Sequence, residues 1–396
     1  MNLTDFFKFE RNKMKKIGIV GAGFSGAVIA RELALSGYQV DVFDSRSHVA
    51  GNCHTERDPE TNIMIHKYGP HIFHTSNEKI WRYVNQFDEF MPFTNRVKAI
   101  YKNNVYSLPI NLLTINNFFK KTFSPDEASH FIKSLSVEST SEPITFEEQA
   151  LRFIGNDLYE AFLKGYTIKQ WGLHPSKLPA SILKRLPVRF NYDDNYYSST
   201  YQGMPRNGYT HIVQQILNHE NINLVLSTDF HRDQVNNYEH VFSSGAIDSW
   251  FEHSIGSLAY RTLDFKLERH KGDYQGNPVI NYCDEDVSWT RITEFKHFSP
   301  WESSDQTLIF KEFSRACEIN DIPYYPIRLV DDKVLLNKYI ELAKSEKNVT
   351  FVGRLGTYRY LDMHITIAEA LDAAASFLNA KAKGIPMNSF VINPES

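Results

Sequence analysis

The stretch "KIGIVGAGFSGAVIARELALSGYQVDVFD", residues 16–44, decides the fold. The apolar run 16–20 suits a buried parallel strand. Three glycines follow it with the spacing G-x-G-x-x-G: Gly21, Gly23 and Gly26. Residues 27–37 have helical composition, and a second apolar run, 38–43, ends at Asp44. Strand, glycine turn, helix, strand and acid in this order predict a dinucleotide-binding βαβ unit.

Each part of this unit has a physical role. Gly21 allows the tight turn, and Gly23 lets the backbone approach a pyrophosphate. Gly26 lets the helix pack close to the strand, and the helix N-terminus faces the phosphates. Asp44 is expected to accept hydrogen bonds from the ribose hydroxyls, which argues against NADP, because NADP needs a basic residue for its 2′-phosphate.

Two further segments favour FAD over NAD. Arg46 and the pair Gly51-Asn52 follow the second strand, where backbone lying against more of the cofactor is expected. Near the other end, a strand leads to Gly353-Arg354, and Asp362 then opens a helix. A segment late in the chain that returns to the first domain with a strand, a glycine and an acidic residue is typical of FAD binding. We therefore predict an FAD-binding, Rossmann-like domain that is discontinuous in sequence.

Composition limits the remaining choices. The chain has 396 residues, of which 42% are hydrophobic, and a net charge of −4. It can bury a large core, and it lacks the basic excess of a nucleic-acid-binding protein. Three widely spaced cysteines are read as reduced thiols of a cytoplasmic protein. No apolar run is long enough to cross a bilayer, so no membrane insertion is expected.

The rest of the chain changes character twice. Residues 77–182 show helical periodicity, and residues 190–345 alternate short β-rich runs with turns. The expected fold class is α/β, with an inserted helical domain and an antiparallel sheet domain. The expected boundaries are an N-terminal extension over 1–14, an FAD-binding domain over 15–85 completed by about 205–250 and 345–380, a helical domain with a mobile loop over 86–195, a substrate-contacting sheet domain over 251–344, and a C-terminal tail over 381–396.

Several longer motifs resemble the flavin-dependent UDP-galactopyranose mutases. They are "GAGFSGAVIA" (21–30), "IHKYGPHIFHT" (65–75), "KGYTIKQWG" (164–172), "LPASILKRLPVRFNYDDNYY" (178–197), "YQGMPRNGYT" (201–210), "WTRITEFKHF" (289–298), "PYYPI" (323–327) and "GRLGTYRYLDMH" (353–364). They occur in order over nearly the whole chain, and several are specific to this family.

The resemblance implies a redox-neutral isomerase. Such an enzyme interconverts the pyranose and furanose rings of a nucleotide-diphospho-sugar, with N5 of reduced FAD as nucleophile on the anomeric carbon. A homodimer and a role in cell-surface polysaccharide biosynthesis are also implied. The default substrate is UDP-galactopyranose.

The resemblance also assigns residues. Catalytic roles fall on Arg185, Arg291 and His74. Substrate contacts fall on Tyr166, Trp171, Arg185, Tyr196, Arg291, Tyr325 and Tyr360. Cofactor contacts fall on Gly21, Gly23, Phe24, Ser25, Gly26, Asp44, Arg46, Gly51, Asn52, Gly69, His71, Gly353, Arg354, Tyr360, Asp362 and Met363.

Three alternatives stay open from the sequence. Departures from the usual motifs, such as Pro70 and Ile168, leave room for TDP-fucopyranose or UDP-N-acetylgalactosamine as the substrate. An amine-oxidase-type FAD oxidoreductase would share the first domain, and a flavin-bound scaffold would share it without catalysis. No metal site is expected, because His66, His71 and His74 have no carboxylate or thiol at a matching spacing.

Overall fold

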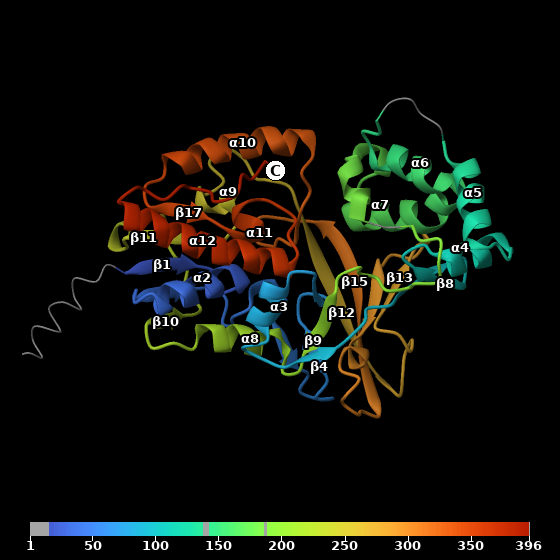
Figure 1. Cartoon of the computed structure of the whole chain (residues 1–396), viewed down its shortest axis with the longest axis horizontal. Coiled ribbons are helices and arrows are strands. Elements are labelled where there is room, and N and C mark those ends of the chain that lie inside the picture. The colour runs from blue at the N-terminus through green and yellow to red at the C-terminus, as the bar shows by residue number, and fades with distance from the viewer. Residues whose placement is uncertain (1–15, 138–141, 186–187, 396) are drawn as a thin grey trace, which may run out of the picture.

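The computed structural model describes residues 16–137, 142–185 and 188–395. The expected extension over 1–14 lies outside these residues. The chain folds into an α/β part, a long mixed sheet and a group of helices that lies beyond the sheet (Figure 1). Among the described residues, no helix has the length and apolar character needed to cross a membrane.

The α/β part contains a five-stranded parallel sheet. Its central strand β1 (Ile17–Val20) pairs with β2 (Val40–Phe43) on one side and β11 (His240–Ser243) on the other. The outer strands are β10 (Ile222–Val225) and β17 (Val349–Phe351). Segments far apart in sequence thus build one Rossmann-like sheet, in line with the prediction of a discontinuous domain.

Helices cover both faces of this sheet. On one face, α2 (Phe24–Leu35) packs against α8 (Gly208–Leu217) and α12 (Met363–Lys383). On the other face lie α9 (Ile247–Trp250) and α10 (Val330–Ser345), whose apolar side chains share a core with β11 and β17. Because both faces are covered, the central strand β1 is a continuous apolar run without polar alternation.

A seven-stranded sheet forms the second part. Its order is β16-β12-β15-β14-β13-β7-β8, and all neighbours are antiparallel except β13 and β7. The strands are β7 (Val97–Tyr101), β8 (Asn104–Leu108), β12 (Tyr260–Lys271), β13 (Val279–Tyr282), β14 (Arg291–Glu294), β15 (Gln306–Ala316) and β16 (Tyr325–Pro326).

Small elements join the two sheets. A three-stranded sheet has the order β5 (Phe73–Thr75), β9 (Tyr201–Pro205) and β6 (Phe90–Pro92). A hairpin of β3 (Thr55–Arg57) and β4 (Met64–His66) precedes it, and α3 (Glu78–Val84) follows β5. Short helical segments, η1 (Gly51–Cys53), η5 (Arg232–Asn237), η6 (Phe295–Phe298) and α11 (Gly353–Gly356), connect the larger elements.

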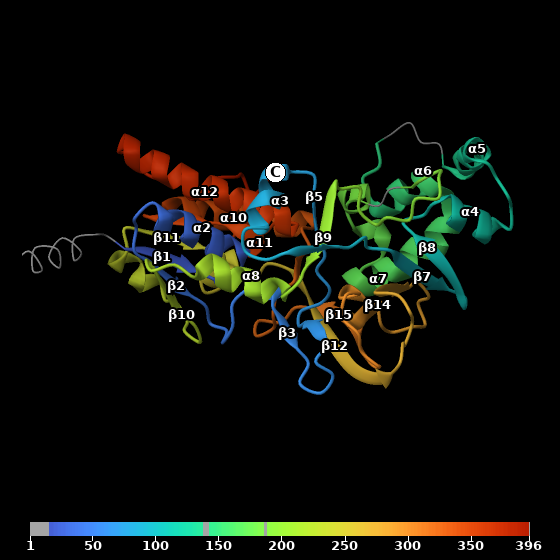
Figure 2. The same cartoon turned by 60° about the horizontal axis from the view of Figure 1, so that its bottom comes forward.

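The helical part has its own apolar core. Its helices are α4 (Leu112–Phe119), α5 (Pro125–Leu135), α6 (Phe146–Leu158), the π-helix η2 (Tyr159–Lys164), α7 (Gly165–Trp171), η3 (Pro175–Lys177) and η4 (Ala180–Arg185). Ser124 and Thr145 begin α5 and α6 with complete capping boxes, as their positions before Glu127 and Glu148 indicate. Figure 2 shows α7 lying against the sheet that contains β15.

The helical domain was expected over 86–195, but the first residues of that range are not helical. Residues 97–108 form a β-hairpin that extends the seven-stranded sheet. Lys102 and Asn103 both have positive φ, as a two-residue hairpin turn requires, and Val97 and Ala99 alternate inward along β7. We propose that the helical domain begins at Leu112. The expected tail over 381–396 is also shorter, because α12 continues to Lys383.

Histidines whose pKa is lowered by burial make the stability of this fold depend on pH, His66, His71 and His240 among them. Burial lowers the pKa of His66 to about 3, of His71 to about 4 and of His240 to about 3. An unfolded chain therefore binds more protons than the folded one as the pH falls below about 6.5. Their neutral forms stabilise the fold fully above this pH, and the stabilisation declines by about 1.4 kcal/mol per histidine for each pH unit below it.

We expect urea to unfold the protein at a clearly lower concentration at about pH 5.5 than at about pH 7. The variant His240→Gln should show a smaller difference than the wild type, since one of the titrating groups is gone. Equal midpoints for the wild type at both pH values would contradict the burial argument.

Candidate active site

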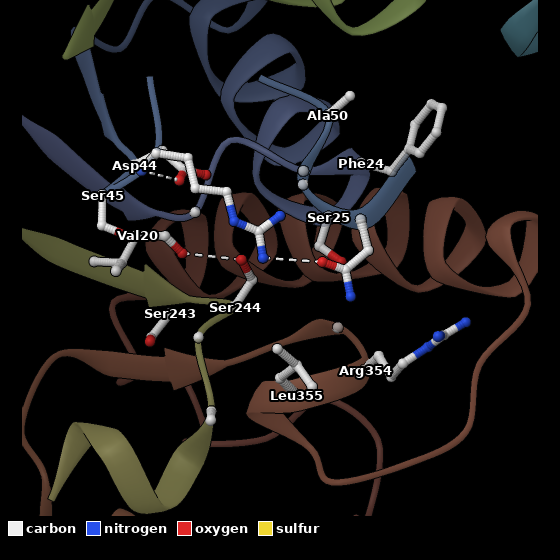
Figure 3. Close-up of a pocket in the computed structure, with 18 of the residues that line it drawn as sticks. Val20, Phe24, Ser25, Asp44, Ser45, Ala50, Ser243, Ser244, Arg354 and Leu355 are labelled. Atoms are coloured by element: carbon white, nitrogen blue, oxygen red, sulfur yellow. Dashed lines mark hydrogen bonds between the residues drawn. The ribbon is translucent and has the colours of Figure 1, made fainter. Parts of the chain in front are cut away.

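A cavity of about 470 Å³ opens at the carboxyl ends of β1, β2 and β11. From β1 the chain continues to β2, which lies on one side of β1, whereas β11 pairs with β1 on its other side. The cavity therefore lies where the strand order reverses. Ligands of open α/β sheets bind at this position. Figure 3 shows Asp44 and Arg354 at opposite sides of the cavity, with Phe24 and Ser25 at the start of α2.

Two glycines of the turn differ in the space around them: Gly26 is tightly enclosed, whereas Gly23 leaves room for a cofactor. A Cβ atom on Gly26 would lie 1.9 Å from the carbonyl oxygen of Gly21, so Gly26 serves close packing of helix on strand. A Cβ on Gly23 would meet nothing nearer than the Gly51 Cα, 3.9 Å away. Gly23 therefore faces space that the protein itself leaves open.

Asp44 holds the glycine turn in place. Its Oδ2 accepts a hydrogen bond of 2.8 Å from the Ala22 N–H, and its Oδ1 accepts one of 2.9 Å from the Arg46 N–H. Each carboxylate oxygen keeps a second lone pair, which leaves the acceptor capacity that a ribose hydroxyl needs.

The polar atoms around the cavity fit a dinucleotide. Arg46 donates through Nη2 to Asn52, while its Nη1 is buried without a hydrogen-bond partner among the described residues. At the far end, Phe230 and Trp250 form a stacked aromatic wall with ring centroids 6.2 Å apart, and the Trp250 Nε1 also lacks a partner. Unpaired donors and flat apolar walls are suited to phosphate oxygens and an adenine ring.

Most of the residues predicted to contact the cofactor line this cavity: Gly21, Gly23, Phe24, Ser25, Asp44, Arg46, Gly51, Asn52, His71, Gly353, Arg354 and Met363. Gly26, Gly69, Tyr360 and Asp362 do not line it. The lining also includes residues that sequence reasoning missed, among them Thr228, Asp229, Phe230, Ser244, Ser249 and Trp250. They lie on the loops after β10 and β11 and on the short helix α9, where no local motif marks them.

A second group of polar side chains surrounds Arg291, on β14. Three tyrosines interact electrostatically with its guanidinium. They are Tyr196, Tyr166 on α7, and Tyr325 on β16. The ring of Tyr325 stacks on that of Tyr360, with centroids 5.6 Å apart. Five of the tyrosines and arginines assigned to the substrate from widely separated motifs therefore gather around one another in the structure.

These tyrosines are hydrogen-bond donors at neutral pH. Burial raises the pKa of Tyr166, Tyr196 and Tyr325 above the ordinary value. Each phenol keeps its proton and can donate to an anionic oxygen, as can the guanidinium of Arg291. The group is therefore suited to bind phosphate.

Glu312 orients Arg291 and was not foreseen from the sequence. This buried carboxylate, on β15, accepts a hydrogen bond of 3.0 Å from the Arg291 Nε and another from the Thr290 hydroxyl. Burial lowers the pKa of Arg291, but Glu312 and the three tyrosines together raise it well above its usual value, so the guanidinium stays charged. Since Glu312 binds Nε, the two terminal nitrogens of Arg291 remain available for bidentate contact with a phosphate.

Arg354 connects the cofactor cavity to the tyrosines. It lines the cavity, and its guanidinium lies over the ring of Tyr360, 5.2 Å from the centroid, and near that of Tyr325, at 5.9 Å. Its Nη2 donates to the Leu361 carbonyl at 2.6 Å. The two candidate subsites are therefore contiguous.

Comparison with known proteins decides the family. The model of the UDP-galactopyranose mutase family matches residues 161–360, and that of the NAD(P)-binding Rossmann-like domain matches 19–87. The chain is 60% identical over 378 residues to a probable UDP-galactopyranose mutase of Klebsiella pneumoniae, covering 96% of this chain and 98% of that protein. The chain belongs to the UDP-galactopyranose mutase family. It is therefore a mutase, an enzyme of the isomerase class.

The name of a second relative contains a different sugar. A dTDP-fucopyranose mutase of Escherichia coli is 52% identical over 372 residues, which is 92% of this chain and 99% of that protein. Among solved structures, a reduced UDP-galactopyranose mutase has a TM-score of 0.72 at 16% identity, covering 95% of this chain and 98% of that one. A putrescine oxidase variant has a TM-score of 0.56 at 9% identity, which shows a shared fold alone.

Three further residues that the family resemblance assigned are not among the described side chains that interact with Arg291. Arg185 ends η4, but its side chain lies outside the described residues. Trp171, at the end of α7, packs against the core of the helical part. His74 stacks on Tyr197 with ring centroids 3.7 Å apart, and its Nδ1 lies 3.0 Å from the Ser199 Oγ.

Lys169, which the motif "GYTIKQW" contains without an assigned role, holds a loop beside Arg291. From α7 its Nζ contacts four backbone carbonyl oxygens of the loop between β13 and β14, at 2.8 to 3.1 Å: those of Tyr282, Asp284, Val287 and Trp289. Lys169 thus fastens the helix that carries Tyr166 to the loop that leads into Arg291.

Replacing Lys169 by methionine should leave these carbonyls without their donor. A buried acceptor that loses its partner costs about 1–3 kcal/mol, so we expect the midpoint of thermal unfolding to fall by several degrees. The matched control is Lys164→Met, which removes only a partly exposed pair with Glu160 and should shift the midpoint by less than about 1 °C. Equal shifts for the two variants in differential scanning fluorimetry would show that the loop contact contributes nothing.

Proposed function

We propose that this enzyme interconverts the pyranose and furanose forms of a nucleotide-diphospho-sugar, with UDP-galactopyranose as its substrate and FAD as its cofactor. The observation that carries the proposal is the Arg291 group, which lies beside the cofactor cavity in a chain that is 60% identical to a probable UDP-galactopyranose mutase. Bound in the cavity, the flavin supplies in its reduced form the nucleophile at N5.

The protein residues have the complementary tasks of binding and charge stabilisation. Arg291 and the phenols of Tyr166, Tyr196 and Tyr325 hold the diphosphate and stabilise the negative charge that builds on it when its bond to the anomeric carbon breaks. One such donor is typically worth about 3–4 kcal/mol in the transition state. Glu312 keeps Arg291 in position without occupying its terminal nitrogens. We propose that Arg185 adds a second guanidinium to the diphosphate.

The proposal also covers the wider setting. We propose a homodimer in the cytoplasm that feeds cell-surface polysaccharide synthesis; the three free cysteines are consistent with a reducing compartment. Size-exclusion chromatography with light scattering tests the dimer, since a monomer mass at micromolar concentration would refute it.

The choice of sugar needs a direct test, because a dTDP-fucopyranose mutase is 52% identical to the chain. We would incubate dithionite-reduced protein separately with UDP-galactose, UDP-N-acetylgalactosamine and TDP-fucose, and separate the products by liquid chromatography. Oxidised protein is the control for each. We expect a furanose product from UDP-galactose in the reduced sample alone.

The other outcomes are equally informative. A faster reaction with TDP-fucose would move the proposal to that sugar while keeping the chemistry. No furanose from any of the three, together with bleaching of oxidised flavin by a substrate, would replace the mutase by an oxidoreductase.

A further inference from the structure

Three metal-ligating side chains converge next to the cofactor cavity. They are His74 on β5, Asp362 at the N-terminus of α12 and His364 in its first turn. Their ligand atoms all lie within 4.8 Å of one another. The cavity is lined by the neighbouring residues His71 and Met363 but by none of these three, so the cluster adjoins the cofactor site without being part of its wall.

Each of the three offers a donor atom that the fold leaves uncommitted. The Nδ1 of His74 contacts the Ser199 hydroxyl, which leaves Nε2 available. The Nδ1 of His364 is buried and has no hydrogen-bond partner among the described residues. The Asp362 carboxylate makes no capping hydrogen bond to the helix that it begins. A buried polar atom without a partner calls for an explanation, and a bound ligand is one.

The electrostatic surroundings favour a cation. Burial lowers the pKa of His74 to about 4 and also lowers that of His364, so both rings are neutral at pH 7 and hold a free lone pair. Among the residues that the structure describes, Asp362 is the charged neighbour that shifts both pKa values, and no lysine or arginine contributes to either shift. A single carboxylate with two neutral imidazoles carries a charge of −1.

We propose that His74, Asp362 and His364 bind a divalent transition-metal ion of the Zn²⁺ class. Two imidazoles and a carboxylate are a donor set that Zn²⁺ takes with its fourth position open. Zinc bonds of about 2.1 Å require donors roughly 3.4 Å apart, so side-chain rotation must bring the three atoms about an ångström closer. Ser199 then serves as the outer-shell partner that fixes the His74 ring.

Metal binding would affect the enzyme in a definite direction. The ion would tie the first turn of α12 to β5 and occupy His74, whose ring stacks on Tyr197 beside the Arg291 group. We therefore expect Zn²⁺ to inhibit catalysis and to raise the thermal unfolding midpoint, because a ligand that binds only the folded state stabilises it.

A second cluster of side chains that could hold a metal ion provides the control. Asp273, Glu294 and His297 also bring their ligand atoms within 4.8 Å. Glu294 is already saturated, since it accepts N–H groups from residues 274–276, and the Lys296 ammonium lies 2.7 Å from Asp273. The cation site there is filled by a lysine, so no metal is expected.

The test is a Zn²⁺ titration of metal-stripped, FAD-loaded protein by isothermal calorimetry. We expect one ion per chain. His364→Asn should weaken binding at least about ten-fold, because loss of an outer-shell partner alone typically costs 10- to 100-fold. His297→Asn, the matched control, should bind as the wild type does. Mg²⁺, which prefers oxygen ligands, should not compete.

Two results would overturn the proposal. One is a wild-type affinity that His364→Asn leaves unchanged, and the other is a loss of binding in His297→Asn instead. If His364→Asn fails to retain flavin, Asp362→Asn replaces it, since the amide keeps the shape of the side chain and removes its charge. These readouts do not require turnover, so they stand apart from the identity of the sugar.

Discussion

Replacing Arg291 by alanine is expected to lower kcat/KM of the reduced enzyme for UDP-galactose by about 10²- to 10³-fold. The guanidinium is the positive centre of a group whose other members, Tyr166, Tyr196 and Tyr325, are neutral. Without it, the departing diphosphate would keep the neutral phenols and only the one guanidinium that we propose for Arg185. Arg291→Lys should recover part of the loss, because it restores the charge but not the bidentate geometry.

The control for this variant is Arg315→Ala. Arg315, on the neighbouring strand β15, is exposed and pairs with Asp264 and Asp321. Its removal should change kcat/KM by less than about two-fold, as is usual for surface ion pairs. Flavin content and thermal midpoint must be compared in parallel, since Arg291→Ala also leaves Glu312 without its partner. A folded, flavin-loaded Arg291→Ala variant within a few-fold of wild-type activity would remove Arg291 from the diphosphate site.

Alanine substitutions at Gly26 and Gly23 are expected to separate folding from cofactor binding. At Gly26 the new Cβ would lie 1.9 Å from the Gly21 carbonyl oxygen and 2.8 Å from the Ile19 Cγ2, and neither the turn nor the strand can move away. The strain exceeds the roughly 1–3 kcal/mol of ordinary overpacking, so we expect insoluble protein or protein without flavin.

Gly23→Ala should instead fold normally. Its φ of −79° suits alanine, and the nearest atom to the new Cβ lies at an ordinary contact distance of 3.9 Å. The methyl group would project into the space reserved for the pyrophosphate. We therefore expect an apoprotein with an unchanged unfolding midpoint and FAD affinity weakened by at least about ten-fold, measured by fluorescence titration.

Gly37→Ala, at the other end of α2, is the matched control. Its Cβ meets nothing within 4 Å, and its positive φ of 91° makes the substitution mildly destabilising, by about 1–2 kcal/mol, without any effect on flavin. Unchanged FAD affinity in Gly23→Ala would mean that the cofactor backbone does not approach this turn.

Local sequence was sufficient where structure is governed by short-range rules. The βαβ unit from β1 to β2 formed as expected, because apolar runs, glycine spacing and the terminal acid are all encoded within residues 16–44. The caps at Ser124 and Thr145 follow for the same reason. The hairpin over 97–108 was missed, since Lys102-Asn103 is a weaker turn signal than Asn-Gly and the helical periodicity on either side dominated.

Residue types in the candidate site could be predicted, but their arrangement could not. The motifs assigned particular arginines and tyrosines to the substrate, yet nothing in them indicated that Glu312 holds Arg291 or that Lys169 fastens its loop. Both contacts arise because strand pairing brings β14 beside β15 and because α7 packs on that sheet.

By itself, then, the sequence determined the cofactor-binding unit, the family and the chemical character of the site, because each depends on residues close together in the chain. The tertiary structure alone decided which distant side chains meet: Phe230 with Trp250 at the cavity end, Arg291 with its tyrosines, and His74 with Asp362 and His364. Such contacts join segments tens to hundreds of residues apart. They follow from the order in which strands pair and helices pack, which no local pattern encodes.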